Sequence, residues 1–301
     1  MSRASRRGTV LALAIGLLSM VAARAQSPAP MRNGELPAVS PDGSQIAFES
    51  DRGGATGLYL IRADGTGRRN LVPDVGETSG APAWAADGRH LLYATTAAGI
   101  GQLYEVDVRS GTRRLVASVP GRGPTLSPDR RHLLFMAGSY TATTLTVSDL
   151  DGAHAHLVSD GTATAWNPAW SPDGSRIAFT GRSGASDELK IFLVNADGSG
   201  LRQVTRLPPG AGNAQWPVWS PDGRRLAIQV NRSREGDARI WIVDPATLAA
   251  HPLRRHDRAW LDETPSWFPD GRRLAFQSNR TGRMELWVMD ADGSGARQVT
   301  R

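Results

Sequence analysis

The chain has 301 residues, of which 40% are hydrophobic and 21% charged, and this composition excludes a mostly disordered protein. It contains no cysteine, which excludes disulfides, cysteine-ligated zinc and thiol nucleophiles. The formal net charge is +6, but residues 1–25 hold four arginines and no acidic residue, which leaves +2 for the rest of the chain. We therefore expect no nucleic-acid partner.

Residues 1–25 have the three-part pattern of an export signal. A basic start is followed by an apolar stretch at 8–23, and Ala23-Arg24-Ala25 supplies small residues before a cleavage site. The apolar stretch is shorter than the roughly 20 residues of a membrane span. We expect cleavage before Gln26, a short segment at 26–34, and a periplasmic or secreted mature chain that does not span the membrane. The alternative is an uncleaved anchor.

A unit of 42–49 residues is repeated six times over residues 35–301. A Pro-x-Trp step such as Pro168-Ala169-Trp170 opens four of the units, and an apolar triplet such as Ile177-Ala178-Phe179 follows the central turn. A loop, a second apolar run and an Asp-x-Asp-Gly turn complete the unit. The central turn is Ser-Pro-Asp-Gly or a variant of it, and its aspartates are Asp42, Asp87, Asp129, Asp173, Asp222 and Asp270.

Each unit predicts four short strands, because its apolar runs are β-branched or aromatic and are bounded by Gly, Pro, Asn and Asp. The middle strands are apolar at consecutive positions, as a strand buried on both faces requires. Radial repetition of such sheets gives an all-β fold, a six-bladed β-propeller of four-stranded antiparallel blades. The sequence leaves open whether the ring closes by packing of the sixth blade on the first or with Gln26–Leu36 adding a strand.

The repeated pattern Trp-Ser-Pro-Asp-Gly, then Ile-Ala-Phe, then Asp-x-Asp-Gly resembles the WD40-like PD40 repeat of the TolB β-propeller family over residues 35–301. The resemblance implies the propeller fold and a role in the cell envelope, of which Tol-type biopolymer transport is one form. That family carries an α/β domain before its propeller. Residues 26–34 are too short for such a domain, so we expect a propeller that stands alone.

Two short segments resemble calcium-binding loops and one resembles part of a metal site, but none has the full set of ligands. Residues 195–200 and 290–295 match the first six positions of a calcium loop, yet position twelve, where the loop needs Glu, is Arg206 or Arg301. We expect β-turns there. His154-x-His156 has no further ligand at metal spacing and is expected to be an exposed pair. We expect no enzyme activity, no cofactor and no metal.

An antiparallel blade places the blade-to-blade connections and the loops between second and third strands on one face, here named the loop face. The two kinds of Asp-Gly turn lie on the opposite face, the turn face. Variable loops on a rigid scaffold are where binding residues concentrate. The connections hold Glu77, Trp166, Trp216, Trp260, Asp262 and Glu263, and one position of the second-to-third loops holds Arg52, Arg182, Arg232 and Arg280.

The four arginines have two interpretations. They fasten their loops, or they form a cationic mouth of the central channel, rimmed by Trp216, Trp260 and Glu263, that binds a carboxylate-bearing peptide. We expect a monomeric, non-enzymatic propeller that binds an envelope protein or peptide. The alternatives are a propeller accessory to a prolyl-peptidase-type hydrolase, and a glycan-binding or lyase propeller in which two of these tryptophans stack on sugars.

Overall fold

The computed structural model describes residues 33–76, 78, 80–139, 141–159, 164–182, 188–232, 237–253 and 260–301, without the side chains of residues 33–35 and 232. All of them belong to the second of the two units of the chain, residues 31–301. The predicted signal peptide at 1–25 lies outside the described residues.

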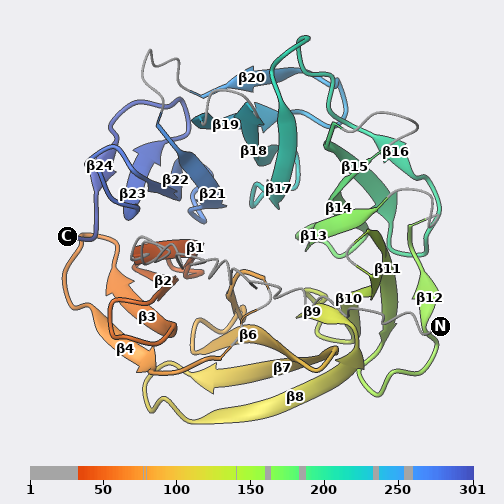
Figure 1. Ribbon diagram of the computed structural model, residues 1–301, viewed down its shortest axis with the longest axis horizontal. Coiled ribbons are helices and arrows are strands. Elements are labelled where there is room, and N and C mark those ends of the chain that lie inside the picture. The colour runs from red at the N-terminus through yellow and green to blue at the C-terminus, as the bar shows by residue number, and fades with distance from the viewer. Residues whose placement is uncertain are drawn as a thin grey trace, which may run out of the picture. The chain divides into compact units, whose positions relative to one another are not determined.

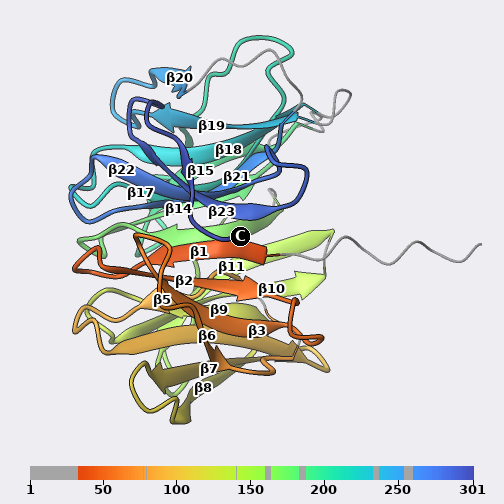
Figure 2. The same cartoon turned by 90° about the vertical axis from the view of Figure 1, so that its left-hand side faces the viewer.

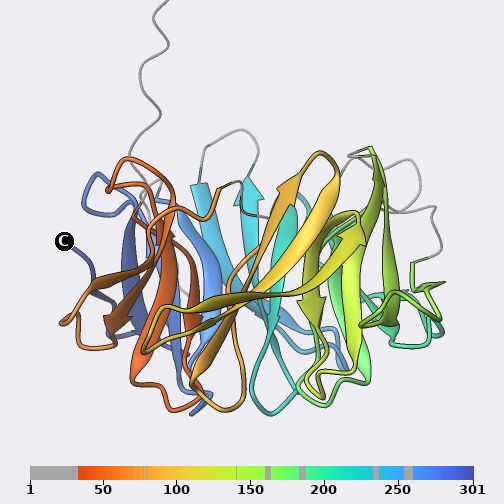
Figure 3. The ribbon, with the colours of Figure 1, turned by 90° about the horizontal axis from the view of Figure 1, so that it is seen from below.

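The regular elements of the described residues are all strands, and they form six antiparallel sheets of four strands each. The sheets are arranged as blades around a ring (Figure 1). Seen from the edge of the ring, the strands run side by side between two rows of loops and turns (Figures 2 and 3). The predicted six-bladed β-propeller is therefore confirmed.

The first three blades take up residues 33–157. Blade 1 consists of β1 (Asn33–Val39), β2 (Gln45–Ser50), β3 (Gly57–Arg62) and β4 (Arg69–Val72). Blade 2 consists of β5 (Ala83–Trp84), β6 (His90–Ala97), β7 (Ile100–Asp107) and β8 (Arg113–Pro120). Blade 3 consists of β9 (Arg122–Leu126), β10 (His132–Ser139), β11 (Ala142–Asp149) and β12 (His156–Leu157).

The other three blades repeat the same order from the inside of the ring outward. Blade 4 consists of β13 (Ala165–Trp170), β14 (Arg176–Gly181), β15 (Lys190–Asn195) and β16 (Arg202–Gln203). Blade 5 consists of β17 (Asn213–Trp219), β18 (Leu226–Arg232), β19 (Asp237–Val243) and β20 (Ala250–Pro252). Blade 6 consists of β21 (Asp262–Trp267), β22 (Arg273–Ser278), β23 (Glu285–Asp290) and β24 (Arg297–Gln298).

The core is divided among the blade junctions. The described residues form six hydrophobic clusters, one between each pair of neighbouring blades. Ile177 and Phe179 of β14 face blade 3, whereas Ala178 between them faces blade 5. All three side chains are fully buried. Consecutive apolar residues are needed in the middle strands because each of their faces packs on a different neighbour.

Hydrogen bonds inside the Ser-Pro-Asp-Gly turns explain their recurrence. In blade 4, Ser171 Oγ donates to Asp173 Oδ1 at 2.5 Å, and Gly174 N donates to the Ser171 carbonyl at 2.8 Å. Gly174 has a φ of +72°, which favours glycine. The two calcium-like sequences also fold as β-turns, since Gly198 N donates to Asn195 O and Gly293 N donates to Asp290 O.

The ring closes by packing of blade 6 on blade 1. Each sheet is built from one continuous segment of the chain, and Asn33–Leu36 lie in the inner strand of blade 1 itself. Ile46 and Phe48 of β2 pack with Phe268 and Leu286 of blade 6 in one buried cluster. The seam between the first and last blades is thus built like the other junctions.

Candidate functional site

The inner strands of four blades share a backbone kink at a residue with a Cβ. In each, the residue before the proline that opens the unit has a positive φ, and the pairing with the second strand shifts register there. In blade 3, Gly123 takes the same position before Pro124. A positive φ is unfavourable for any residue with a Cβ, and a strained residue of this kind costs about 1–3 kcal/mol. The kinked residues are Leu36 (φ 49°), Asn167 (φ 50°), Trp216 (φ 52°) and Thr264 (φ 47°).

The kinks bring polar residues into cross-strand register. The position directly after the apolar triplet of the second strand is polar in four blades, and it pairs with the residue that precedes the kink. Side chains opposite each other in an antiparallel pair are in contact range. The pairs are Glu35 with Glu49, Trp166 with Thr180, Gln215 with Gln229, and Glu263 with Gln277.

A hydrogen-bonded cluster joins blades 5 and 6 at this level. Gln229 Nε2 donates to Glu263 Oε1 at 3.2 Å, and Gln277 Nε2 donates to Glu263 Oε2 at 3.0 Å. Gln229 Oε1 accepts from the backbone N–H of Thr264 at 3.1 Å. Both glutamine side chains are buried, and Glu263 is half-buried. The carboxylate is therefore held by amide donors from two blades.

Three buried polar atoms of this level lack a hydrogen bond within the described residues. They are Gln277 Oε1, Thr264 Oγ1 and Thr180 Oγ1. A buried polar group without a partner costs about 1–3 kcal/mol. Such groups are uncommon in folded proteins and call for an explanation such as a ligand or an ordered water. A partner that supplied donors and acceptors here would recover this cost.

The side chain of Arg280 is buried and held in place by an acidic residue and aromatic rings. Its side chain is 6% exposed and forms an ion pair with Asp262, with Nε at 3.1 Å from Oδ1. Its guanidinium carbon lies 5.3 Å from the ring centre of Trp260 and 5.5 Å from that of Trp287. Ion pairing and cation–π contacts both occupy this guanidinium.

The other predicted arginines have separate surroundings. Arg52 forms an ion pair with Glu285 of blade 6 and donates to the carbonyl of Arg301 at 2.8 Å. Arg182 is exposed, with its guanidinium carbon 5.4 Å from the ring centre of Trp166. The side chain of Arg232 lies outside the described residues. The structure therefore brings Trp260 to Arg280 and Trp166 to Arg182, and leaves Arg52 at the seam.

The assignment of several predicted residues to connections was wrong. Trp166, Trp216, Asp262 and Glu263 lie in inner strands. The reason is the kink, because the inner strand continues upstream of the proline although the repeat pattern stops there. Trp260 does precede its strand, while Glu77 lies outside the described residues.

The sequence analysis also missed the polar position after the apolar triplet. A comparison of the six units would have found it, because the same position holds Glu49, Thr180, Gln229 and Gln277 where a buried strand predicts an apolar residue. Two of these side chains, Gln229 and Gln277, bind the predicted residue Glu263. The candidate site, named the inner mouth, comprises the inner-strand residues Trp166, Trp216, Glu263 and Thr264, the second-strand residues Thr180, Gln229 and Gln277, and Arg182.

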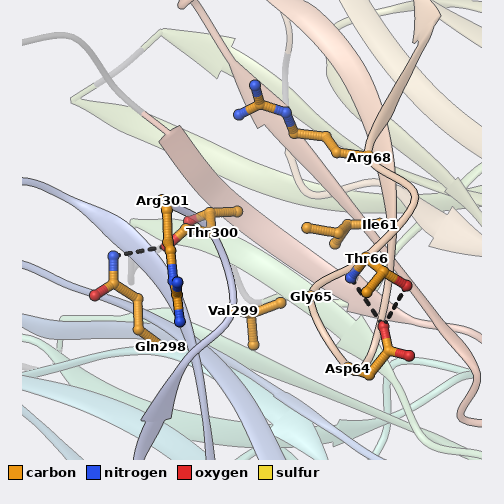
Figure 4. Close-up of a pocket in the computed structure, with 9 residues that line it drawn as sticks. All are labelled: Ile61, Asp64, Gly65, Thr66, Arg68, Gln298, Val299, Thr300 and Arg301. Carbon is orange, nitrogen blue, oxygen red and sulfur yellow. Dashed lines mark hydrogen bonds between the residues drawn. The ribbon is translucent and has the colours of Figure 1, made fainter.

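Apart from the inner mouth, a pocket with a volume of about 400 Å³ lies at the seam between blades 1 and 6 (Figure 4). It lies between the turn at Asp64–Arg68 and the segment Gln298–Arg301. Two of the polar groups there bond within their own segments: Asp64 Oδ1 accepts from Thr66 N at 2.8 Å, and Gln298 Nε2 donates to Thr300 O at 2.6 Å. The Arg301 carbonyl accepts from Arg52, and Thr300 Oγ1 donates to Glu285.

The described residues hold neither a metal-binding cluster nor a membrane-spanning helix. No three His, Asp or Glu side chains of the described residues are placed to hold a metal ion together. The two histidines singled out from the sequence diverge, since His154 Nδ1 lies 2.7 Å from Asp149 Oδ2 whereas His156 Nε2 lies 3.1 Å from Ala196 O. None of the described residues forms a helix long and apolar enough to cross a membrane.

The repeats match a known domain over nearly the whole chain. The TolB beta propeller domain matches residues 18–143 and 136–301. The chain belongs to the TolB β-propeller family. A crystal structure of TolB from Acinetobacter baumannii shares the fold, with a TM-score of 0.68 at 20% identity over 85% of this chain and 63% of that one.

Proteins similar in sequence to this chain differ in their descriptions. An uncharacterized protein of Agrobacterium fabrum is 26% identical over 184 residues, which are 58% of this chain and 62% of that protein. The uncharacterized peptidase YuxL of Bacillus subtilis is 31% identical over 154 residues, 50% of this chain and 22% of the peptidase. The chain thus spans less than two thirds of the length of both relatives.

Proposed function

We propose that this TolB-family propeller is a non-enzymatic, exported scaffold that binds a protein or peptide partner at the inner mouth. The observation that carries the proposal is the set of buried, unpaired polar atoms at Thr180, Thr264 and Gln277, counted over the described residues. Thr264 is itself a kinked residue, and the strands of Thr180 and Gln277 pair with kinked inner strands. Strained backbone of this kind is found at ligand-binding sites.

The chemistry of the inner mouth suits a polypeptide. Carboxamide and hydroxyl groups both donate and accept, as a peptide backbone requires. Trp166 and Trp216 are half-buried and offer aromatic surface beside these groups, which is favoured at interfaces. The exposed Arg182 can hold a carboxylate of the partner. A partner segment with an acidic residue next to an apolar anchor fits this arrangement.

The place of action follows from residues 1–25. Cleavage before Gln26 would release the propeller to the periplasm, where Tol-type biopolymer transport is one process that such a scaffold serves; secretion from the cell is the alternative. N-terminal sequencing of the protein from the envelope fraction tests the proposal. A chain beginning at Gln26 is expected, and an intact Met1 on a membrane-bound protein would contradict it.

The similarity to the peptidase YuxL favours one competing function, that of a propeller working with a hydrolase domain. A propeller of that kind would raise or redirect the hydrolysis of short proline-containing peptides by a partner chain. Incubation of the purified mature protein, alone and with the envelope fraction, with such peptides separates the two functions. Peptide hydrolysis that depends on the added protein would contradict the scaffold proposal and support the hydrolase-associated function. Cleavage or binding of oligosaccharides by the mature protein would instead support a glycan-active propeller.

Site-specific photocrosslinking tests the inner mouth directly. A photoreactive residue in place of Arg182 is expected to capture a partner in cells of the source organism. The matched control replaces Arg224, which is equally an exposed arginine but lies in the Pro-Asp-Gly turn of blade 5, on the turn face. Capture from position 182 alone supports the proposal. Capture from neither position, or from position 224 alone, contradicts it.

A further inference from the structure

Two blade junctions on the turn face are closed by the same arginine–tryptophan pair. Between blades 4 and 5, the guanidinium carbon of Arg176 lies 4.7 Å from the ring centre of Trp219, and its Nη2 donates to the Gly223 carbonyl at 3.3 Å. Between blades 5 and 6, Arg225 lies over Trp267 in the same way at 4.9 Å. Both tryptophans are buried, with 6% and 5% of their surface exposed. At both junctions a guanidinium thus covers the tryptophan of this position.

The junction between blades 3 and 4 has the tryptophan but not the arginine. Its tryptophan is Trp170, and the position of the covering arginine is taken by the shorter His132. Trp170 is only half-buried, and a cavity of about 570 Å³ opens beside both side chains. The junction therefore lacks the group that closes the next two junctions along the chain.

Trp170 also lacks the hydrogen bond that fixes its counterparts. Trp219 Nε1 donates to the Ala169 carbonyl at 3.2 Å, and Trp267 Nε1 donates to Val218 O at 3.3 Å. The buried Nε1 of Trp170 has no partner among the residues that the structure describes. This indole is therefore less constrained, and it can adjust to a group that enters the cavity.

The charged and titratable groups that line the cavity are three aspartates and the histidines His132 and His156. Each of the three aspartates is held through its Oδ1 by a serine of its own turn. The hydrogen bond from Ser171 lowers the pKa of Asp173 to about 2. Serine hydrogen bonds likewise hold the pKa of Asp129 and of Asp197 below the usual value. All three carboxylates are ionised at neutral pH, so a cation is attracted and an anion repelled.

We propose that this cavity is a receptor for an arginine side chain presented by a partner polypeptide. The guanidinium would stack on Trp170, donate to the carbonyl of Gly174, which is the counterpart of Gly223, and approach the carboxylates of Asp129 and Asp173. A free arginine would carry its own carboxylate towards ionised aspartates, which favours a blocked residue within a chain. The site lies on the turn face and is independent of the inner mouth, so either proposal can fail without the other.

Titration of the mature protein with three probes tests the site. Nuclear magnetic resonance of ¹⁵N-labelled indoles reports each tryptophan, and Trp170→Phe identifies the resonance of Trp170. The acetylated, amidated peptide Gly-Arg-Gly is expected to shift this resonance saturably. The same peptide with neutral citrulline in place of arginine should bind at least about tenfold more weakly, because the cation–π and ionic attractions are lost. Free L-arginine should also bind more weakly.

Filling the cavity from within is the sharper test. His132→Arg introduces the arginine that blades 4 and 5 carry at this position, and is expected to abolish peptide binding while raising Tm by about 2–4 °C. The matched control is His90→Arg at the same position of blade 2, because the next blade there carries Leu126 at the tryptophan position. It should leave binding unchanged. No saturable shift at Trp170, equal binding of the citrulline peptide, tighter binding of free arginine, or full binding by the His132→Arg variant would each overturn the proposal.

Discussion

Arg52 of blade 1 forms an ion pair with Glu285 of blade 6 across the seam where the ring closes. The Glu285 side chain is 4% exposed and that of Arg52 is 23% exposed. Thr300 Oγ1 also donates to Glu285 Oε2 at 2.6 Å. Since the described strands of blades 1 and 6 share no sheet, this polar contact and the buried cluster beneath it hold the two ends of the propeller together.

Removal of one member of this pair should destabilise the propeller. Arg52→Ala leaves a buried carboxylate without its cation, and we expect the free energy of unfolding to fall by about 2 kcal/mol, between the values typical of exposed and buried pairs. Urea unfolding measures the change. Arg224→Ala, an exposed arginine in a turn, is the control and should cost at most about 0.5 kcal/mol. Equal losses in the two variants would mean that the pair does not stabilise the seam.

The serine–aspartate turns predict how stability depends on pH. Hydrogen bonds from serine hydroxyls lower the pKa of Asp42, Asp173 and Asp222, that of Asp173 to about 2. A carboxyl whose pKa is lower in the folded than in the unfolded chain stabilises the fold above its unfolded value of about 3.9. This contribution is lost as the pH falls towards about 2. Unfolding free energies should therefore decline over that interval.

Removal of the Ser171 hydroxyl tests whether its hydrogen bond lowers the pKa of Asp173. Ser171→Ala removes the largest contribution to the low pKa of Asp173, so the carboxyl should titrate at a higher pH in the variant, as followed by its ¹³C resonance. Ser118→Ala removes an exposed serine of β8, outside the turns, and is the control. An unchanged titration of Asp173 in the Ser171→Ala variant would assign the shift to another group.

The core of each blade junction should respond strongly to a cavity. Phe179 is fully buried between blades 3 and 4, and Phe179→Ala is expected to cost about 3–5 kcal/mol of unfolding free energy. Leu157→Ala, in a strand of the same junction but with 58% of its surface exposed, should change the stability by at most about 0.5 kcal/mol. Chemical denaturation measures both. A loss below about 1 kcal/mol for Phe179→Ala would contradict the packing.

The sequence was sufficient to predict the blades because turn chemistry and burial repeat in it. Ser171 and Asp173 recur with the glycine whose positive φ the turn needs, and the apolar triplet recurs because each middle strand packs on two neighbours. These are local rules, so they can be recognised from spacing alone. The same rules predicted both β-turns of the calcium-like sequences.

The candidate site was less predictable because it depends on contacts between blades. Nothing near Arg52 in the sequence identifies Glu285 as its partner, and the pairing of Arg280 with Asp262 needs the register of two strands. The kink that follows Glu263 in the inner strand is the positive φ of Thr264. Threonine rarely adopts a positive φ, so the sequence does not predict the kink. Long-range pairing and backbone strain leave no short pattern in the chain.

Backbone strain at the inner mouth can be measured by removing a Cβ. Thr264 and Thr180 are both buried threonines whose hydroxyls lack a partner in the described part of the chain, but only Thr264 has a positive φ, of 47°. A β-branched residue is strained in that conformation and glycine is not. Thr264→Gly should therefore lose about 1–3 kcal/mol less unfolding free energy than Thr180→Gly, which removes a side chain from an ordinary strand.

Urea denaturation of the two glycine variants makes this comparison, with the Thr→Ser variants at both positions as controls that keep the hydroxyl and the Cβ. Serine keeps the Cβ, so the strain remains at position 264 and stays absent at position 180. The losses of unfolding free energy at the two positions should therefore differ less in the serine variants than in the glycine variants. If Thr264→Gly cost as much as Thr180→Gly, the kink would be an unstrained part of the strand. The inner mouth would then lose the backbone argument for binding and rest on its unpaired polar atoms alone.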